Sequence, residues 1–265
     1  MEFKICLYED WMKEQVTELF CKQYGVSYNQ FNCFFENLYE HEFQKMRTIR
    51  AVALDDKKVV GLQSFFYWPY QKNGKTYNSF QSGNSLVHPD YRGKGIFQQL
   101  LNYIYDNSKQ LNIDFLIGFP IEASFNSLIR NKWINAFNLK WYVKINNPVS
   151  FLFRVHQKKV FELFGQSQII LENPEENAYR LVRNEEMCAW RKSYISDVKF
   201  CETYQDGDRI VQFELKHNVR KKIIKINELV IGDIRTNTTD ILIVQKGLSC
   251  LLKKIRSLPF ISIVS

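Results

Sequence analysis

Several features of other protein classes are missing from this chain of 265 residues. No stretch approaches the roughly 18 consecutive apolar residues that a membrane-spanning helix requires. The first residues, from Met1 to Cys6, lack the charged and then apolar layout of a signal peptide. We therefore expect a cytoplasmic protein without a membrane span.

Paired redox and metal-ligating motifs are missing as well. The chain has six cysteines and four histidines, but no C-x-x-C and no cysteine paired with a histidine at metal-ligand spacing. This scatter predicts reduced, mostly buried thiols, and it supports neither a metal site nor a Cys–His nucleophile pair. The residues are Cys6, Cys21, Cys33, Cys188, Cys201, Cys250, His41, His88, His156 and His217.

Positive charge, by contrast, is in excess, with a formal net charge of +8 at pH 7. This favours an anionic partner such as a nucleotide-bearing cofactor, a nucleic acid or an acidic surface. Two basic clusters, at 220–225 and 253–256, are compatible with an RNA footprint. Because basic runs at the edges of helices and strands are usually solvated, nucleic acid is not the expected partner.

The most informative segment runs from Val87 to Leu101 and reads Val-His-Pro-Asp-Tyr-Arg-Gly-Lys-Gly-Ile-Phe-Gln-Gln-Leu-Leu. It predicts a strand end, a glycine-rich basic turn and the start of an amphipathic helix. Glycine lets the main chain approach a ligand closely, and the first N–H groups of a helix attract anions. The segment therefore predicts a phosphate site with Arg92 and Lys94 beside it; a plain turn is the alternative.

In these residues the chain resembles the GCN5-related N-acetyltransferases (GNAT). Their signature is Gln/Arg-x-x-Gly-x-Gly/Ala after a strand, and Arg92-x-x-Gly95-x-Phe97 matches it except at the last position. The resemblance extends from about Met1 to Asn147. It implies an α/β (α+β) fold with a mixed, mostly antiparallel sheet and flanking helices, and acetyl-CoA as co-substrate.

The resemblance also implies which residues hold acetyl-CoA. Main-chain N–H groups at the end of the strand hold the thioester carbonyl, those of the loop hold the pyrophosphate, and a later helix adds one polar side chain. The expected residues are Leu86, Val87, His88, Arg92, Gly93, Lys94, Gly95, Ile96, Phe97 and Asn126.

Catalytic residues are less clearly marked. The family pattern Asn-x-x-Ala-x-x-x-Tyr-x-x-x-Gly-Phe, aligned on Lys132-Trp133, puts Leu128 where a tyrosine commonly serves as acid. Glu122 and Tyr142 are the substitute candidates, although a carboxylate in a first helical turn often serves the helix dipole and a strand tyrosine often packs. Asn84, on the strand before the loop, is a candidate to orient a polar group of the acceptor.

The expected order of elements agrees with this fold. Hairpin turns are expected at 55–58 and at Asn73-Gly74. The expected strands are 3–8, 49–54, 59–68, 79–88, 115–117 and 133–145, and the expected helices are 11–24, 28–44, 95–111 and 121–131.

Asn146-Asn147-Pro148 is the expected boundary between a GNAT-like acyl-CoA-binding domain, 1–147, and a smaller C-terminal α+β domain, 148–265. This second domain repeats the order of the first without a glycine-rich loop, which predicts a degenerate GNAT-like repeat without a cofactor; an unrelated α+β cap is the alternative. Its expected strands are 179–182, 198–204, 209–216, 222–231 and 261–264, and its expected helices are 151–164, 185–192 and 241–255.

The sequence thus predicts an acyl-CoA-dependent N-acyltransferase, in the first instance an acetyltransferase, that modifies the amine of a small metabolite. An amino sugar as acceptor rests on the resemblance alone. The alternatives are a non-catalytic protein that binds RNA or a nucleotide through a phosphate, and a transferase that uses aminoacyl-tRNA. The oligomeric state, including a homodimer, stays open.

Overall fold

The structure is a computed structural model that describes residues 3–138, 140, 142–145, 164, 178–194, 199–221, 225–256 and 261–264. The chain divides into two compact units, one of residues 1–136 with 177–195 and one of residues 137–176 with 196–265. This division differs from the single boundary expected at Asn147, because residues 177–195 return to the first unit.

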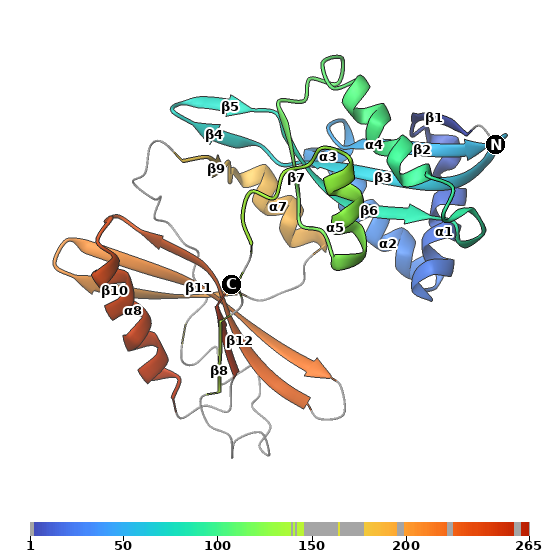
Figure 1. The fold of residues 1–265 in the computed structure, drawn as a ribbon. Coiled ribbons are helices and arrows are strands. Elements are labelled where there is room, and N and C mark those ends of the chain that lie inside the picture. The colour runs from blue at the N-terminus through green and yellow to red at the C-terminus, as the bar shows by residue number, and fades with distance from the viewer. Residues whose placement is uncertain are drawn as a thin grey trace. The chain divides into compact units, whose positions relative to one another are not determined.

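The first unit is built on a five-stranded sheet that consists of β1 (Lys4–Leu7), β2 (Ile49–Asp55), β3 (Lys58–Tyr67), β6 (Ser79–Val87) and β7 (Phe115–Gly118). The strand order is β1-β2-β3-β6-β7 (Figure 1). All neighbours are antiparallel except β6 and β7, which are parallel. The expected mixed, mostly antiparallel sheet is confirmed.

Helices cover both faces of this sheet. One face packs against the first two long helices through a core rich in phenylalanine. The opposite face packs against the helix that follows the glycine-rich loop, through Ile96, Leu100 and Ile104. The helices are η1 (Asp10–Met12), α1 (Lys13–Tyr24), α2 (Tyr28–Tyr39), α3 (Glu42–Lys45), η2 (Pro89–Tyr91), α4 (Ile96–Asp106), α5 (Glu122–Arg130) and α7 (Glu185–Tyr194).

The helix expected over 28–44 is two helices. α2 begins with a capping box between Ser27 and Gln30 and ends at Tyr39. His41 then begins α3, because its Nδ1 accepts a hydrogen bond from the N–H of Phe43 (3.2 Å). The sequence pattern conceals this break, since apolar residues keep helical spacing across it.

Helix α7 belongs to the core of the first unit. Trp190 is only 1% exposed, and its ring centre lies 5.5 Å from the ring centres of Phe43 and Trp68. Its Nε1 donates a hydrogen bond to the carbonyl of Leu38 (3.0 Å). This buried tryptophan explains why the segment returns to the first unit.

The first unit also contains a small second sheet, whose last strand precedes α7 in the sequence. It has the order β5-β4-β9, formed by β4 (Tyr70–Lys72), β5 (Lys75–Tyr77) and β9 (Arg180–Leu181). The turn between β4 and β5 is Asn73-Gly74, as the sequence predicts, and both residues have positive φ (49° and 74°).

Part of the strand order of the first unit recurs in the second, whereas the fifth strand lies at the opposite edge of its sheet. β10 (Lys199–Asp206), β11 (Arg209–Lys221) and β12 (Lys225–Thr236) pair antiparallel, and α8 (Ile241–Lys254) then leads to β13 (Ile261–Val264), which is parallel to β12. β8 (Tyr142–Ile145) pairs with the far side of β13. This recurrence supports the predicted repeat, which remains a proposal.

Some expectations fall differently. Within 133–145, only Tyr142–Ile145 is a strand among the described residues. The helix expected over 151–164 lies outside the described residues except for Phe164. No helix in the described ranges is long and apolar enough to cross a membrane.

The expectation of mostly buried thiols is wrong. All six cysteines are free, but Cys33, Cys188 and Cys250 are exposed, and only Cys201 is fully buried. The exposed ones lie on the outer faces of α2, α7 and α8, where helix geometry turns them away from each core.

We expect Trp190→Ala to lower the free energy of unfolding by about 3–5 kcal/mol, because truncation leaves a large cavity between α7 and the sheet. Urea unfolding of the full chain measures this. Trp11→Ala is the control, since Trp11 is half exposed, with an expected loss below about 1 kcal/mol. An unchanged urea midpoint for Trp190→Ala would contradict the assignment of α7 to this core.

Candidate functional site

Strand β6 loses one of its two neighbours halfway along its length. Its pairing with β7 covers only Ser79–Ser82. Further along, the N–H of His88 donates to the carbonyl of Val60 on β3 (2.8 Å). Because successive residues of a strand direct their N–H groups to opposite sides, the N–H of Val87 points away from β3, toward the side that β7 has left.

A β-bulge lies in this unpaired stretch. Between two regular pairs of β3 and β6, the single residue Gln63 stands opposite two residues, Asn84 and Ser85. Asn84 has a φ of +50°, a left-handed conformation that asparagine tolerates better than most residues. A bulge of this kind redirects side chains and is common beside active sites.

Polar side chains hold the bulge from both faces of the sheet. On the α2 face, Asn84 Nδ2 donates to the hydroxyl of Tyr39 (2.9 Å), which also hydrogen-bonds Ser64 Oγ (2.9 Å). On the other face, the hydroxyl of Ser85 donates to Oε1 of the buried Gln63. Burial raises the pKa of Tyr39, so its hydroxyl stays protonated.

The loop after β6 offers a row of main-chain donors. Gly93 and Gly95 have φ of +77° and +74°, and no side chain caps α4 at Gly95. Across the described chain, no group accepts a hydrogen bond from the N–H groups of residues 93–98. Since the first turn of α4 also has no acidic residue, this helix start is suited to an anion.

Arg92 fixes the loop to its surroundings. Its Nε donates to the carbonyl of Val87 (3.2 Å), and its Nη2 donates to Oε1 of Gln23 on α1 (2.6 Å). The first contact orients the main chain of Val87 next to the unpaired side of β6. Arg92 therefore positions the loop as well as adding positive charge to it.

The side chains of Lys94 and Lys58 both make cation–π contacts with the ring of Tyr91. Their ammonium groups are 4.7 Å and 5.3 Å from the ring centre of Tyr91. The Tyr91 hydroxyl donates to Asp55 Oδ2 (2.7 Å), and this hydrogen bond raises the pKa of Tyr91. The cluster keeps two cations beside the loop; Lys58 was not among the expected residues.

The other expected cofactor residues have structural contacts. His88 caps the turn, because its Nδ1 accepts from the N–H of Asp90 (3.3 Å). Leu86 and Ile96 are buried, and Phe97 packs against the α4-side core. A Cβ on Gly61 would lie 2.8 Å from Cγ2 of Ile96, so glycine there lets the start of α4 approach the sheet closely.

Helix α5 fits the alignment on Lys132-Trp133, in which the tyrosine that commonly serves as acid is replaced by Leu128. Leu128 is buried in the α4-side core, and Lys132 has a φ of +64° at the position where the family pattern has glycine. Glu122 and Asn126 are exposed on this helix, and their side chains make no hydrogen bond to other described residues. Tyr142 lies on β8, in the sheet of the second unit, and is 64% exposed.

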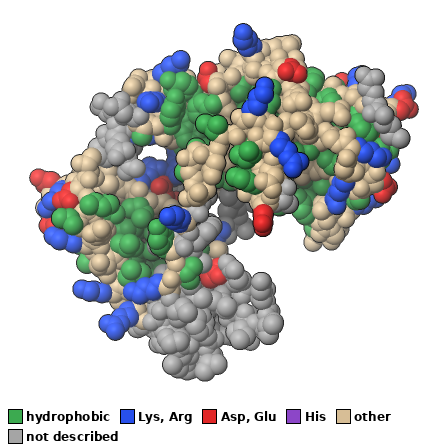
Figure 2. All heavy atoms as spheres, viewed as in Figure 1, with side chains coloured by type: hydrophobic (Ala, Val, Ile, Leu, Met, Phe, Trp, Pro, Cys, Tyr) green, Lys and Arg blue, Asp and Glu red, His purple; other side chains and the backbone are tan. Residues whose placement is uncertain are grey.

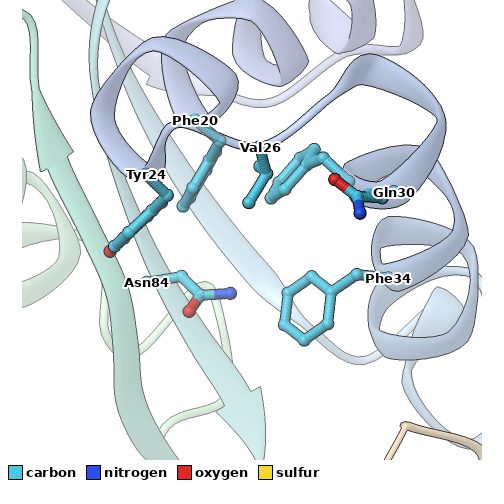
Figure 3. A pocket seen from close by; sticks show the side chains of 7 residues that line it. Phe20, Tyr24, Val26, Gln30, Phe34 and Asn84 are labelled. Atoms are coloured by element: carbon cyan, nitrogen blue, oxygen red, sulfur yellow. The ribbon is translucent and has the colours of Figure 1, made fainter. Parts of the chain in front are cut away.

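A pocket of about 330 Å³ lies beside the bulge, between α1, α2 and β6 (Figure 3). Its lining is largely aromatic, and it includes Asn84 from the bulge. The sequence does not reveal this pocket, because its phenylalanines have the spacing of core residues. The lining residues are Phe20, Tyr24, Val26, Gln30, Phe31, Phe34 and Asn84.

The equivalent helix start in the second unit is closed. β12 has its own bulge, Gly232-Asp233 opposite Glu214, but α8 begins at Asp240. The Asp240 carboxylate accepts from the N–H of Leu242 (2.9 Å) and pairs with Arg209 (3.2 Å). A phosphate at this helix start would meet a carboxylate.

Part of the first unit is similar to a known protein family. A family model described as an acetyltransferase (GNAT) domain matches residues 7–127. This match supports a relationship of that part of the chain to the GCN5-related N-acetyltransferase superfamily. No curated protein sequence matches it.

Two solved structures extend the fold likeness to both units. A probable N-acyltransferase from Enterococcus faecalis is 14% identical with a TM-score of 0.62, and a GCN5-related N-acetyltransferase from Anabaena variabilis is 14% identical with a TM-score of 0.58. Each match covers 99% of this chain and 65% of the other. The chain thus spans slightly less than two thirds of these proteins, and at this identity the likeness concerns the fold alone.

We expect Tyr39→Phe to lower the free energy of unfolding by about 1–2 kcal/mol, because the buried Ser64 hydroxyl and the Asn84 amide lose their partner. Tyr24→Phe, which removes an exposed hydroxyl, is the control and is expected to change it by less than about 0.5 kcal/mol. Urea unfolding compares the two. Equal midpoints would show that the Tyr39 hydrogen bonds do not stabilise the bulge.

Urea unfolding of the unchanged chain and of Tyr39→Phe at several pH values tests the raised pKa of Tyr39. A raised folded-state pKa contributes stability that is complete below the ordinary tyrosine value of 10.0 and is lost as the pH rises above it. The unchanged chain should therefore lose more stability above pH 10 than Tyr39→Phe loses.

Proposed function

We propose that this protein is an acetyl-CoA-dependent N-acetyltransferase that acts on the amine of a small molecule. The observation that carries this proposal is the row of unpartnered N–H groups at residues 93–98, next to the unpaired stretch of β6. A diphosphate needs several converging donors, and an extended amide chain needs a strand edge. Both needs are met side by side here.

The loop residues fit the polar part of the co-substrate. The N–H groups of Gly93, Lys94, Gly95, Ile96 and Phe97 would donate to the pyrophosphate, with the ammonium groups of Lys94 and Lys58 nearby. A Cβ on Gly95 would meet no atom within 4 Å, so the loop leaves space at its surface. Asn126, exposed on α5, is a candidate to bind the amide-bearing arm.

The N–H of Val87 is the best-placed donor for the thioester carbonyl. It faces the side without a neighbouring strand, and its own carbonyl is held by Arg92. In the reaction the amine nitrogen attacks the carbonyl carbon, the C–N bond forms, and the C–S bond breaks. The thiolate leaves with the electron pair and takes up a proton, while the amine loses one.

The proton acceptor and donor stay proposals. Glu122, exposed in the first turn of α5 just after β7, is the candidate base. Tyr142, the other candidate from the sequence, lies on β8 in the second unit and is assigned no role in this site. Leu128 cannot supply a proton, because its side chain is an alkyl group in the core. A water molecule is then the alternative donor to the leaving thiolate.

A nucleic-acid partner receives less support. Lys and Arg side chains are spread over the visible face rather than gathered in one stripe (Figure 2). A protein that reads RNA through its phosphates commonly concentrates its basic residues along one face. We therefore retain the small-molecule amine as the acceptor class.

We expect Gly95→Val to weaken acetyl-CoA binding by about 10- to 100-fold, because valine is strained at a φ of +74° and the loop must change shape, losing hydrogen bonds to the phosphates. Isothermal titration calorimetry measures the affinity. Gly74→Val is a matched control, since Gly74 has the same φ of +74° and also an open surrounding, but lies in the β4–β5 turn. Similar affinities of the two variants would contradict the proposed loop.

We expect Glu122→Gln to lower kcat about 100-fold, because an amide cannot take the proton of the amine. Acetyl-CoA affinity should stay the same. Glu186→Gln on α7 is the control, because this carboxylate pairs with Arg47 on the surface (3.3 Å). An unaltered kcat for Glu122→Gln would remove Glu122 as the base.

A further inference from the structure

The pocket beside the bulge carries information about the acceptor, and this inference rests on the proposed acetyltransferase function. The pocket opens between α1, α2 and β6, and Asn84 is part of its wall (Figure 3). Asn84 precedes Val87 by three residues on β6. A molecule in the pocket would therefore reach the strand that is proposed to hold the thioester.

The lining has almost no capacity to bind a sugar or a phosphate. None of the lining side chains is charged, and only Gln30, Asn84 and the Tyr24 hydroxyl are polar. Oε1 of Gln30 already accepts from the N–H and the hydroxyl of Ser27. Nδ2 of Asn84 already donates to Tyr39. The hydroxyl groups of a hexosamine would lose water here without enough partners.

Aromatic rings form the rest of the wall. The Phe20 ring is stacked on Phe31 (centres 4.6 Å apart, planes at 16°) and on Tyr24 (5.9 Å, 17°). Phe20 and Phe31 are buried and form the floor, whereas Tyr24, Val26 and Phe34 remain 36–58% exposed around it. Exposed apolar side chains gathered around a hollow are typical of a ligand site.

Asn84 offers an oxygen atom to the amine. Oδ1 of Asn84 can accept a hydrogen bond from an N–H group, because the other end of the amide is held by Tyr39. The apolar surroundings favour the neutral form of an amine, which is the nucleophile, and aromatic faces also attract the ammonium form before it loses its proton. The pocket therefore combines a hydrogen-bond acceptor for the amine with an apolar lining.

We propose that the acceptor is a primary amine on a flat aromatic group, with the ring beside Phe34 on the Phe20–Phe31 floor and the amine near Asn84. This replaces the amino sugar that family resemblance implied. Stacked or edge-on contacts with several rings favour an aromatic group over an aliphatic one of the same size.

The test compares three amines as acceptors for the full chain: 2-phenylethylamine, 2-cyclohexylethylamine and glucosamine. Release of the free CoA thiol gives kcat/KM for each. We expect the kcat/KM for 2-phenylethylamine to be at least about tenfold higher than that for glucosamine. It should be about threefold higher than that for 2-cyclohexylethylamine. A preference for glucosamine, or equal values for the phenyl and cyclohexyl amines, would overturn the proposal.

Variants then locate the effect. Phe34→Ala should lower kcat/KM for 2-phenylethylamine about tenfold, mainly through KM, and leave acetyl-CoA affinity unchanged. Tyr28→Ala is the matched control on the same helix, with 46% exposure against 38% for Phe34 and no place in the lining. Val26→Ala, expected to cost about threefold, serves if Phe34→Ala does not fold. If the Phe34 and Tyr28 variants behave alike, the acceptor does not use this pocket.

Calorimetry with acetyl-CoA separates the two possible failures. If acetyl-CoA binds but the amine results are negative, only the acceptor proposal falls. If acetyl-CoA does not bind at millimolar concentration, the proposed function falls, and the acceptor proposal falls with it.

Discussion

The candidate site of this protein depends on main-chain N–H groups that have no hydrogen-bonding partner. An unpartnered backbone N–H that is removed from water costs about 1–3 kcal/mol, so a fold keeps such groups only where water or a ligand can reach them. Two such places adjoin in the first unit, one on β6 beyond Ser82 and one at the start of α4. A ligand with both amide and phosphate groups satisfies both at once, and this accounts for their adjacency.

The bulge links the proposed cofactor side to the acceptor side. Gln63 and Tyr39 hold it from opposite faces; Tyr39 lies on α2, and Gln63 lies on β3, which contributes to the cores on both sides of the sheet. The extra residue in β6 sends Asn84 toward the aromatic pocket, and Val87 follows with its N–H on the unpaired side. One local irregularity in a strand thus sets the orientation of both Asn84, proposed to hold the acceptor amine, and Val87, proposed to hold the thioester carbonyl.

The sequence predicted the parts of this arrangement that depend on local chemistry. Gly93 and Gly95 marked the loop, the Asn73-Gly74 turn followed from pattern, and the mixed, mostly antiparallel sheet was implied by the family resemblance. The return of α7 to the first unit was missed, because the burial of Trp190 is a contact between residues distant in sequence. The pocket was missed for a related reason. A phenylalanine that is buried in a core and one that lines an open pocket have the same spacing along a helix, so the sequence does not tell them apart.

The two units show how little separates an open anion site from a closed one. Each has three antiparallel strands, a bulge in the third, a helix and a parallel strand. At the helix start the first unit has Gly95, whose missing side chain leaves the N–H groups free, whereas the second has Asp240, whose carboxylate fills that place and is itself paired with Arg209. An internal carboxylate stabilises the helix as a bound phosphate would. Asp240 thus occupies the start of α8, whereas the start of α4 in the first unit stays open to an anion.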